Sequence, residues 1–171
     1  MLKMVVMLAY LKQVKEEIMK GQILRSCVAA LLLTLMGAGH ALAGDIKTVA
    51  VTGAPKAGGP YSQGVIANGF LFTAGILARD PATNNFVEGD MVVQATRVFD
   101  SLEAIVKGAG ASLKDVVKVT VYMTDLADFA KMNDVMVAKF GDHKPARSTV
   151  QVAKLSGTAT LEVDFIAVVP K

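Results

Sequence analysis

Two charged residues in the C-terminal third of the chain, Arg147 and Glu162, are the residues best suited to chemistry. Arg147 stands in "KPARSTVQVAK" and Glu162 in "TLEVDF". An arginine can bind a carboxylate through two parallel hydrogen bonds, although a strand arginine often pairs with a neighbouring acid instead. A glutamate that faces a cleft can orient a water molecule and accept its proton, whereas most strand glutamates are simply solvated. If both residues are functional, Arg147 binds a substrate and Glu162 positions water.

Few other residues offer a nucleophile or a metal ligand. The single cysteine, Cys27, lies in the N-terminal segment, and His143 is the one histidine after residue 43. This composition argues against a thiol nucleophile, a Ser-His-Asp triad and a metal site. The glycine-rich stretch 53–64 lacks the motif lysine and the strand-to-helix context of a phosphate loop. We therefore predict no metal.

The N-terminal segment has the pattern of a secretory signal peptide. From Met19 it has a short basic head, an apolar run over about 27–39 and the triplet Ala41-Leu42-Ala43. The apolar run falls short of the roughly 20 residues that span a bilayer, which argues against a membrane anchor. We predict a signal peptide over 1–43, cleaved near Ala43, and a periplasmic or secreted product that is not membrane-bound. Residues 1–18 lie outside this pattern, so Met19 indicates an over-extended start.

Residues 44–171 are predicted to form a single domain with one core. They contain 13 basic and 13 acidic residues, although the whole chain has 18 and 15. The excess of basic residues therefore lies in the N-terminal segment, and the domain gives no indication of binding nucleic acid. We find no internal repeat and no linker long enough to divide it.

The hydrophobic pattern of this domain predicts two helices and six strands. Asn68-Gly69, between two apolar runs, is a strong hairpin signal. Helices are predicted over 90–107 and from the N-cap Asp125 to about 140, because apolar residues recur there at helical spacing. Strands are predicted near 45–52, 64–67, 70–76, 116–124, 147–152 and 160–169. The order, β-β-β-α-β-α-β-β, is typical of an α+β domain with two helices on one face of a mainly antiparallel sheet.

The uncovered face of this sheet is where we look for function. In the last strand, Ile166 and Val168 share the face that Glu162 occupies, so its apolar end is expected to bury against another subunit. If the last two strands pair as a hairpin with Val150 facing the helices, Arg147 and Glu162 lie together on this uncovered face.

Several motifs in this domain resemble one known family. They are "GPYSQG", "TAG", "VYMTDLADFAKMND", "PARSTVQVAKL" and "LEVDFIAV", in an order and at a spacing similar to those of the Rid family of imine and enamine deaminases, which is also called YjgF-like. The resemblance covers about 47–169. It implies a chorismate mutase-like fold, a homotrimer with small-molecule clefts between subunits, and no cofactor. It also implies hydrolysis of 2-imino or enamine acids to 2-keto acids and ammonia.

The resemblance assigns roles to four residues. It implies that Arg147 holds the substrate carboxylate and that Glu162 is the site glutamate. Tyr61 matches the site tyrosine, which either bonds the substrate or only caps its loop. Asn133 matches the asparagine of the second helix, and it either binds the ligand or holds the backbone.

Three further positions belong to the implied substrate site. Gly75 matches the family glycine, but the usual serine before it is replaced by Ala74, and the usual cysteine after "PARS" is replaced by Thr149. These departures leave open a carboxylate-binding or holdase-like trimer that has lost turnover. A ribonuclease activity, which some relatives share, is weaker because the domain has no net charge for RNA to contact.

Overall fold

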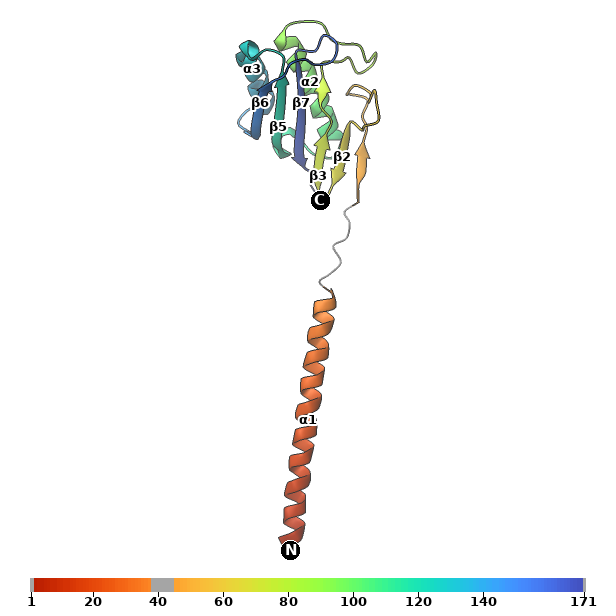
Figure 1. Cartoon of the computed structure of the whole chain (residues 1–171), viewed down its shortest axis with the longest axis vertical. Coiled ribbons are helices and arrows are strands. Elements are labelled where there is room, and N and C mark those ends of the chain that lie inside the picture. The colour runs from red at the N-terminus through yellow and green to blue at the C-terminus, as the bar shows by residue number, and fades with distance from the viewer. Residues whose placement is uncertain (1, 38–44, 171) are drawn as a thin grey trace. The chain divides into compact units, whose positions relative to one another are not determined.

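The computed structural model describes residues 2–37 and 45–170 of the chain (Figure 1). Its internal contacts form two compact units, Met1–Ala43 and Gly44–Lys171. The described part of the first unit is one helix, α1 (Leu2–Gly37). Within the described ranges, no helix combines the length and the apolar character needed to cross a membrane. The predicted cleavage triplet 41–43 lies outside the described residues, and the signal peptide stays a prediction.

The second unit has the predicted order of elements. Asn68 and Gly69 both have positive φ, at 51° and 79°, and form the tight turn of the predicted hairpin. The predicted strand 70–76 is divided in two, because the chain leaves the ladder at Ala74 and Gly75. The elements are β1 (Lys47–Val49), β2 (Gly64–Ala67), β3 (Phe70–Thr73), β4 (Ile76–Leu77), α2 (Met91–Gly108), β5 (Val116–Met123), α3 (Phe129–Phe140), β6 (Ala146–Gln151) and β7 (Leu161–Val168), with short 3₁₀ turns at Leu113–Asp115 and Leu126–Asp128.

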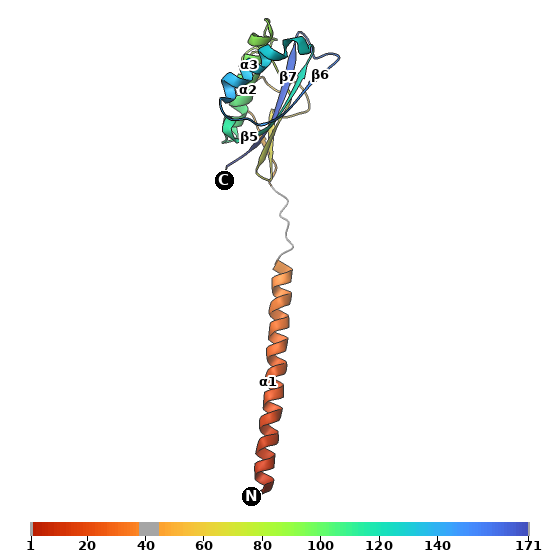
Figure 2. The ribbon, with the colours of Figure 1, turned by 90° about the vertical axis from the view of Figure 1, so that its left-hand side faces the viewer.

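Both helices of this unit cover the same face of the sheet (Figure 2). Asp90 caps α2 by accepting a hydrogen bond from the Val93 amide at 3.1 Å. Phe99 of α2, Phe140 of α3 and Phe165 of β7 pack together, with ring centroids 5.6 to 6.2 Å apart. This aromatic cluster anchors the core, and the predicted α+β class with two helices on one face is confirmed.

The second of these helices begins later than predicted. Asp125 caps a 3₁₀ turn by accepting from the Ala127 amide, and α3 starts only at Phe129. A 3₁₀ turn at the start of an α-helix is common, and the helical spacing of apolar residues does not distinguish the two.

The predicted hairpin between the last two strands is wrong. The sheet order is β1-β2-β3-β7-β5-β6, with β4 also paired to β7. β6 pairs in parallel with β5, because α3 connects them as a β-α-β crossover. β7 instead lies between β3 and β5, antiparallel to both. The sheet is mainly antiparallel, as predicted, with one parallel pair at its edge.

This topology moves Arg147 to the other face of the sheet. Arg147 lies beside Val119 in the ladder, and Val119 is fully buried beneath the helices. Glu162 lies beside Tyr122, which is on the opposite face, because successive residues of β5 alternate. The expectation that Arg147 and Glu162 share the uncovered face is therefore wrong for a single chain.

The uncovered face of the sheet has an apolar half. Phe70 and Phe72 of β3 are 43% and 45% exposed, and they lie beside Val168 and Ile166 of β7 in the ladder. A contiguous apolar patch of this kind on a soluble domain usually marks an interaction surface.

Candidate functional site

The first part of the candidate site is a small cavity around Glu162 on the uncovered face of the sheet. It has a volume of about 300 Å³ and contains two carboxylates, those of Glu162 and Asp164. The side chain of Glu162 is half-buried, and no described residue donates a hydrogen bond to it. We call this space the Glu162 cavity; it is lined by Thr73, Gly75, Tyr122, Val152, Lys154, Leu155, Glu162 and Asp164.

The surroundings of Glu162 make it a stronger base than an exposed glutamate. Burial raises the pKa of its carboxyl, and the negative charge of Asp164 raises it further. Burial also raises the pKa of Asp164, although hydrogen bonds from Thr120 and Tyr122 oppose the shift. Glu162 therefore has both a raised pKa and acceptor oxygens that are free to bind a water molecule or a substrate.

Gly75 is required for this position of the glutamate. A Cβ built at residue 75 would overlap the Oε1 atom of Glu162, and it would lie 2.8 Å from the Cδ atom of the same side chain. Ala74, in contrast, packs against the hydrophobic core and lines neither of the two cavities that Gly75 lines. The backbone amide of Ala74 donates to the Gln63 carbonyl at 2.9 Å, so residue 74 holds the loop beside the cavity.

The second part of the candidate site lies around Arg147 on the helix side of the sheet. Its Nη1 donates to Oδ1 of Asn133 at 2.9 Å, and the guanidinium lies 5.2 Å from the ring centroid of Phe129. Asn133 thus orients the arginine. The adjoining cavity, of about 310 Å³, is lined by Asn133, Met136, Val137, Phe140, Gly141, His143, Lys144, Pro145 and Arg147.

Arg147 has no acidic partner in the described part of the chain. No carboxylate lies within 4.0 Å of it, and none lines its cavity. A structural ion pair therefore does not explain this half-buried arginine, and most of its donors are available for an anion. Thr149 follows two residues later on the same face, and its hydroxyl is buried without a partner among the described residues.

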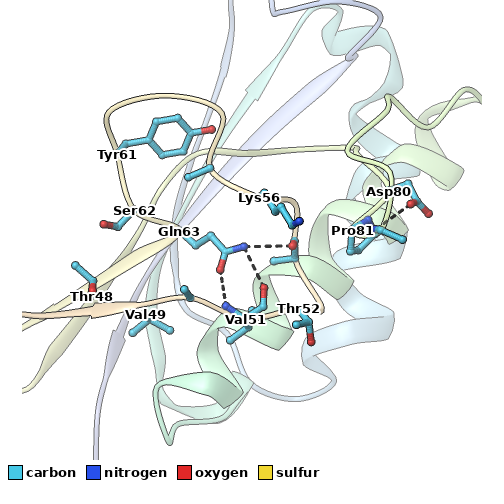
Figure 3. Close-up of a pocket in the computed structure, with 14 residues that line it drawn as sticks. Thr48, Val49, Val51, Thr52, Lys56, Tyr61, Ser62, Gln63, Asp80 and Pro81 are labelled. Atoms are coloured by element: carbon cyan, nitrogen blue, oxygen red, sulfur yellow. Dashed lines mark hydrogen bonds between the residues drawn. The ribbon is translucent and has the colours of Figure 1, made fainter.

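Tyr61 lies in the loop that joins β1 to β2. Its side chain is 55% exposed, and its hydroxyl accepts a hydrogen bond from the Gly58 amide at 3.1 Å. Tyr61 lines a large cavity of about 830 Å³, shown in Figure 3, and also a smaller cavity that Gly75 shares. The loop therefore brings the tyrosine toward the Glu162 side of the molecule rather than toward Arg147.

Gln63 holds this loop in place, a role that the sequence analysis missed. Its Oε1 accepts from the Val51 amide at 2.6 Å, and its Nε2 donates to the carbonyls of Val51 and Ala54, both at 3.2 Å (Figure 3). Its Nε2 also donates to the Pro55 carbonyl at 2.7 Å. The only signal in the sequence is its place in "GPYSQG", beside Tyr61. A buried glutamine with four backbone bonds fixes the position of Tyr61 and Lys56.

One chain does not bring the predicted site residues together. Glu162, Gly75 and Tyr61 line cavities on one side, whereas Arg147 and Asn133 line a cavity on the helix side. None of these four cavities of the described domain contains members of both groups. The described residues also hold no group of three or more His, Cys, Asp or Glu side chains arranged to bind a metal.

The fold and these residues define a two-layer α+β protein whose basic and acidic site residues lie on opposite faces of one sheet. The family model described as Endoribonuclease L-PSP matches residues 51–169. The chain belongs to this family.

Similar proteins include an imine deaminase and a Rid protein, the family that the sequence motifs resemble. A RutC family protein of Pyrococcus abyssi is 50% identical over 114 residues, which cover 67% of this chain and 90% of the relative. The 2-iminobutanoate/2-iminopropanoate deaminase of Escherichia coli is 42% identical over 125 residues, 71% of this chain and 97% of that protein. The crystal structure of RidA from a Psychrobacter species matches with a TM-score of 0.69 and 41% identity, covering 72% of this chain and 99% of that one. The predicted family is confirmed.

Proposed function

We propose that this protein hydrolyses small 2-imino acids, or their enamine tautomers, to 2-keto acids and ammonia. The observation that carries the proposal is the half-buried Arg147, whose guanidinium has no acidic partner in the described chain. Its fork suits the carboxylate that every 2-imino acid has. The 42% identity to the E. coli deaminase supports the same reaction.

Each side chain has a defined task in the proposed reaction. Arg147 binds the carboxylate, and Glu162 orients a water molecule and accepts its proton as the oxygen attacks C2. The π electrons of the C=N bond move to the nitrogen, which takes up a proton from solvent and leaves a carbinolamine. Glu162 then returns its proton to the nitrogen, and ammonia leaves with the C–N electron pair. Glu162 accepts the remaining hydroxyl proton and passes it to solvent, so C2 keeps the water oxygen as a ketone. Tyr61 donates a hydrogen bond to the imine nitrogen or to the carboxylate. Imine hydrolysis has a modest barrier, so positioning of the substrate and one general base suffice.

The cleft in this proposal forms between subunits of a homotrimer. Arg147 and Glu162 face opposite sides of the sheet, so one chain cannot present both to one substrate. The apolar half of the uncovered face, with Phe70 and Phe72, supports association through that face. The Arg147 cavity of one subunit then adjoins the Glu162 cavity of the next.

We also propose that the reaction takes place outside the cytoplasm. The support is the pattern of residues 19–43, with its basic head, apolar run and small-residue triplet. The substrates would then arise from amino-acid oxidation in the periplasm or the medium.

A trapping assay tests the reaction. The full chain is added to an amino-acid oxidase acting on alanine, and the imine is trapped as its semicarbazone. We expect the protein to lower the trapped imine, the Arg147→Ala variant to lose this effect, and the exposed-lysine control Lys114→Ala to retain it. No loss of trapped imine would contradict the proposal. Calorimetry with 2-ketobutyrate then decides whether the protein is a carboxylate-binding trimer without turnover.

Mixed oligomers test whether the cleft lies between chains. Arg147→Ala and Glu162→Gln chains are each inactive alone in this proposal. In trimers co-expressed from equal amounts of both, one cleft in about four combines a native arginine with a native glutamate by random assortment. We expect about a quarter of native activity to return. Mixtures as inactive as either variant would refute the inter-subunit cleft.

A further inference from the structure

A basic cavity adjoins the Glu162 cavity. Its volume is about 430 Å³, and Gly75 lines both spaces, so they meet at that residue. Lys56 and Arg79 are the only charged residues that line it, and Tyr61 and Ser156 add hydroxyl groups. We call this space the basic cavity.

Neither cation of the basic cavity is neutralised by the described part of the protein. No carboxylate lies within 4.0 Å of Lys56 or of Arg79. Two unpaired cations in one concave space repel each other and attract an anion. The cavity is therefore electrostatically suited to a negatively charged ligand group.

Arg79 is held in place for such a contact. Its Nη1 donates to the Asn84 carbonyl at 2.7 Å, and its guanidinium lies 3.7 Å from the ring centroid of Phe86. The backbones of Arg79 and Phe86 also form a β-bridge, and Gly157 leaves room for the Phe86 ring, since a Cβ there would overlap it. The remaining guanidinium donors are thus fixed before a ligand binds, which lowers the entropy cost of binding.

Asn84 contributes an unused polar group to the same wall. Its φ of 62° places it in the left-handed region, and its Oδ1 is buried without a partner among the described residues. A half-turn about its last side-chain torsion exchanges this acceptor for the Nδ2 donor. Buried polar groups normally have a partner, so this side chain has a hydrogen-bonding group that the described residues leave free for a bound ligand.

We propose that the basic cavity receives the substrate side chain and selects 2-imino acids that bear a second carboxylate. This inference rests on the proposed deaminase function, in which Arg147 already holds the first carboxylate. A substrate whose C2 lies at Glu162 extends its side chain past Gly75, the residue that lines both cavities. The second carboxylate then meets Arg79 and Lys56.

The test compares two imines that differ in side-chain charge. An amino-acid oxidase generates 2-iminopropanoate from alanine, and an oxidase active on acidic amino acids generates 2-iminoglutarate from glutamate. We expect kcat/KM to be higher for 2-iminoglutarate than for 2-iminopropanoate. This ratio should fall about tenfold in Arg79→Gln and in Lys56→Gln, because each variant loses about one charged hydrogen bond to the second carboxylate. The control Lys114→Gln removes an exposed lysine elsewhere and should keep the native preference.

The possible outcomes separate the two proposals. The basic-cavity assignment is overturned if the protein turns over both imines without preferring 2-iminoglutarate. It is also overturned if the preference is unchanged in both Arg79→Gln and Lys56→Gln. Either result leaves the deaminase proposal intact. Turnover of neither imine refutes the deaminase. In that case calorimetry with 2-oxoglutarate and 2-ketobutyrate decides the assignment: tighter binding of 2-oxoglutarate that is lost in Arg79→Gln supports it, and equal binding overturns it.

Discussion

Replacing Gly75 by alanine tests the position of Glu162 without removing its carboxylate. The added Cβ would lie 2.8 Å from Cδ and 3.0 Å from Cγ of Glu162, and it would overlap Oε1. Ordinary carbon contacts are about 3.5 to 4 Å, so the glutamate must move by about 1 Å. A displacement of that size in a catalytic group costs about 10²-fold in rate. We therefore expect kcat of Gly75→Ala to fall about a hundredfold.

The fold should tolerate this change. The φ of Gly75 is not in the positive range, so alanine fits its backbone, and the atoms that must move belong to one half-buried side chain. We expect the melting temperature to change by no more than a few degrees, since a compatible Gly→Ala change alters the unfolding free energy by about 1 kcal/mol or less. Circular dichroism on the purified variant measures this.

A double variant shows whether Gly75 acts through Glu162. If it does, the losses in kcat/KM caused by Gly75→Ala and by Glu162→Ala are not additive. Introducing Gly75→Ala into the Glu162→Ala variant then lowers kcat/KM no further. Full additivity of the two losses would refute the steric explanation. So would a Gly75→Ala enzyme with native kcat.

Three other predictions follow from the charges and the uncovered face. The proposed base Glu162 must be ionised to accept a proton, so activity should fall as the pH drops through its raised pKa. Because the negative charge of Asp164 contributes to that shift, Asp164→Asn should move the acidic limb of the kcat/KM profile to lower pH. A carboxyl whose pKa is raised by folding stabilises the protein only at low pH, and this contribution is lost as the pH rises through the folded-state pKa. Glu162→Gln should therefore raise the melting temperature at pH 7, and the difference from the native protein should vanish below about pH 4. An equal gain in melting temperature at both pH values would contradict this. Phe72→Asp should convert the proposed trimer to a monomer in light scattering, while Val92→Asp on α2, also an exposed apolar residue, should not. A trimeric Phe72→Asp variant would place the interface elsewhere.

Much of the fold could be predicted from local patterns. The period-two pattern of β7 places Leu161, Val163 and Phe165 on the side opposite Glu162, and all three are fully buried. Asn68-Gly69 identified the turn between β2 and β3 because both residues tolerate positive φ. These signals depend only on neighbours in the chain.

The partner of β6 could not be predicted in this way. β6 is an edge strand, and all six of its residues are partly or fully exposed, so neither side of its pattern is clearly apolar. Its partner is set by the crossover through α3, a non-local feature. The same limit applies to Gln63, Lys56 and Arg79, because only the folded loop brings them beside Gly75.

The resemblance supplied the candidate residues and implied a cleft between subunits, but the assumed hairpin placed Arg147 and Glu162 on one face of a single chain. Bringing Arg147 to the Glu162 side within one chain would require β6 to leave β5, where six residue pairs are in register. At about 1 kcal/mol for each backbone hydrogen bond, this costs several kcal/mol, close to the whole stability of a small domain. Association of two chains would need no such opening, and through the uncovered face it would also cover the exposed phenylalanines of β3. The energetic comparison therefore favours a site completed by a second copy over one formed by rearrangement.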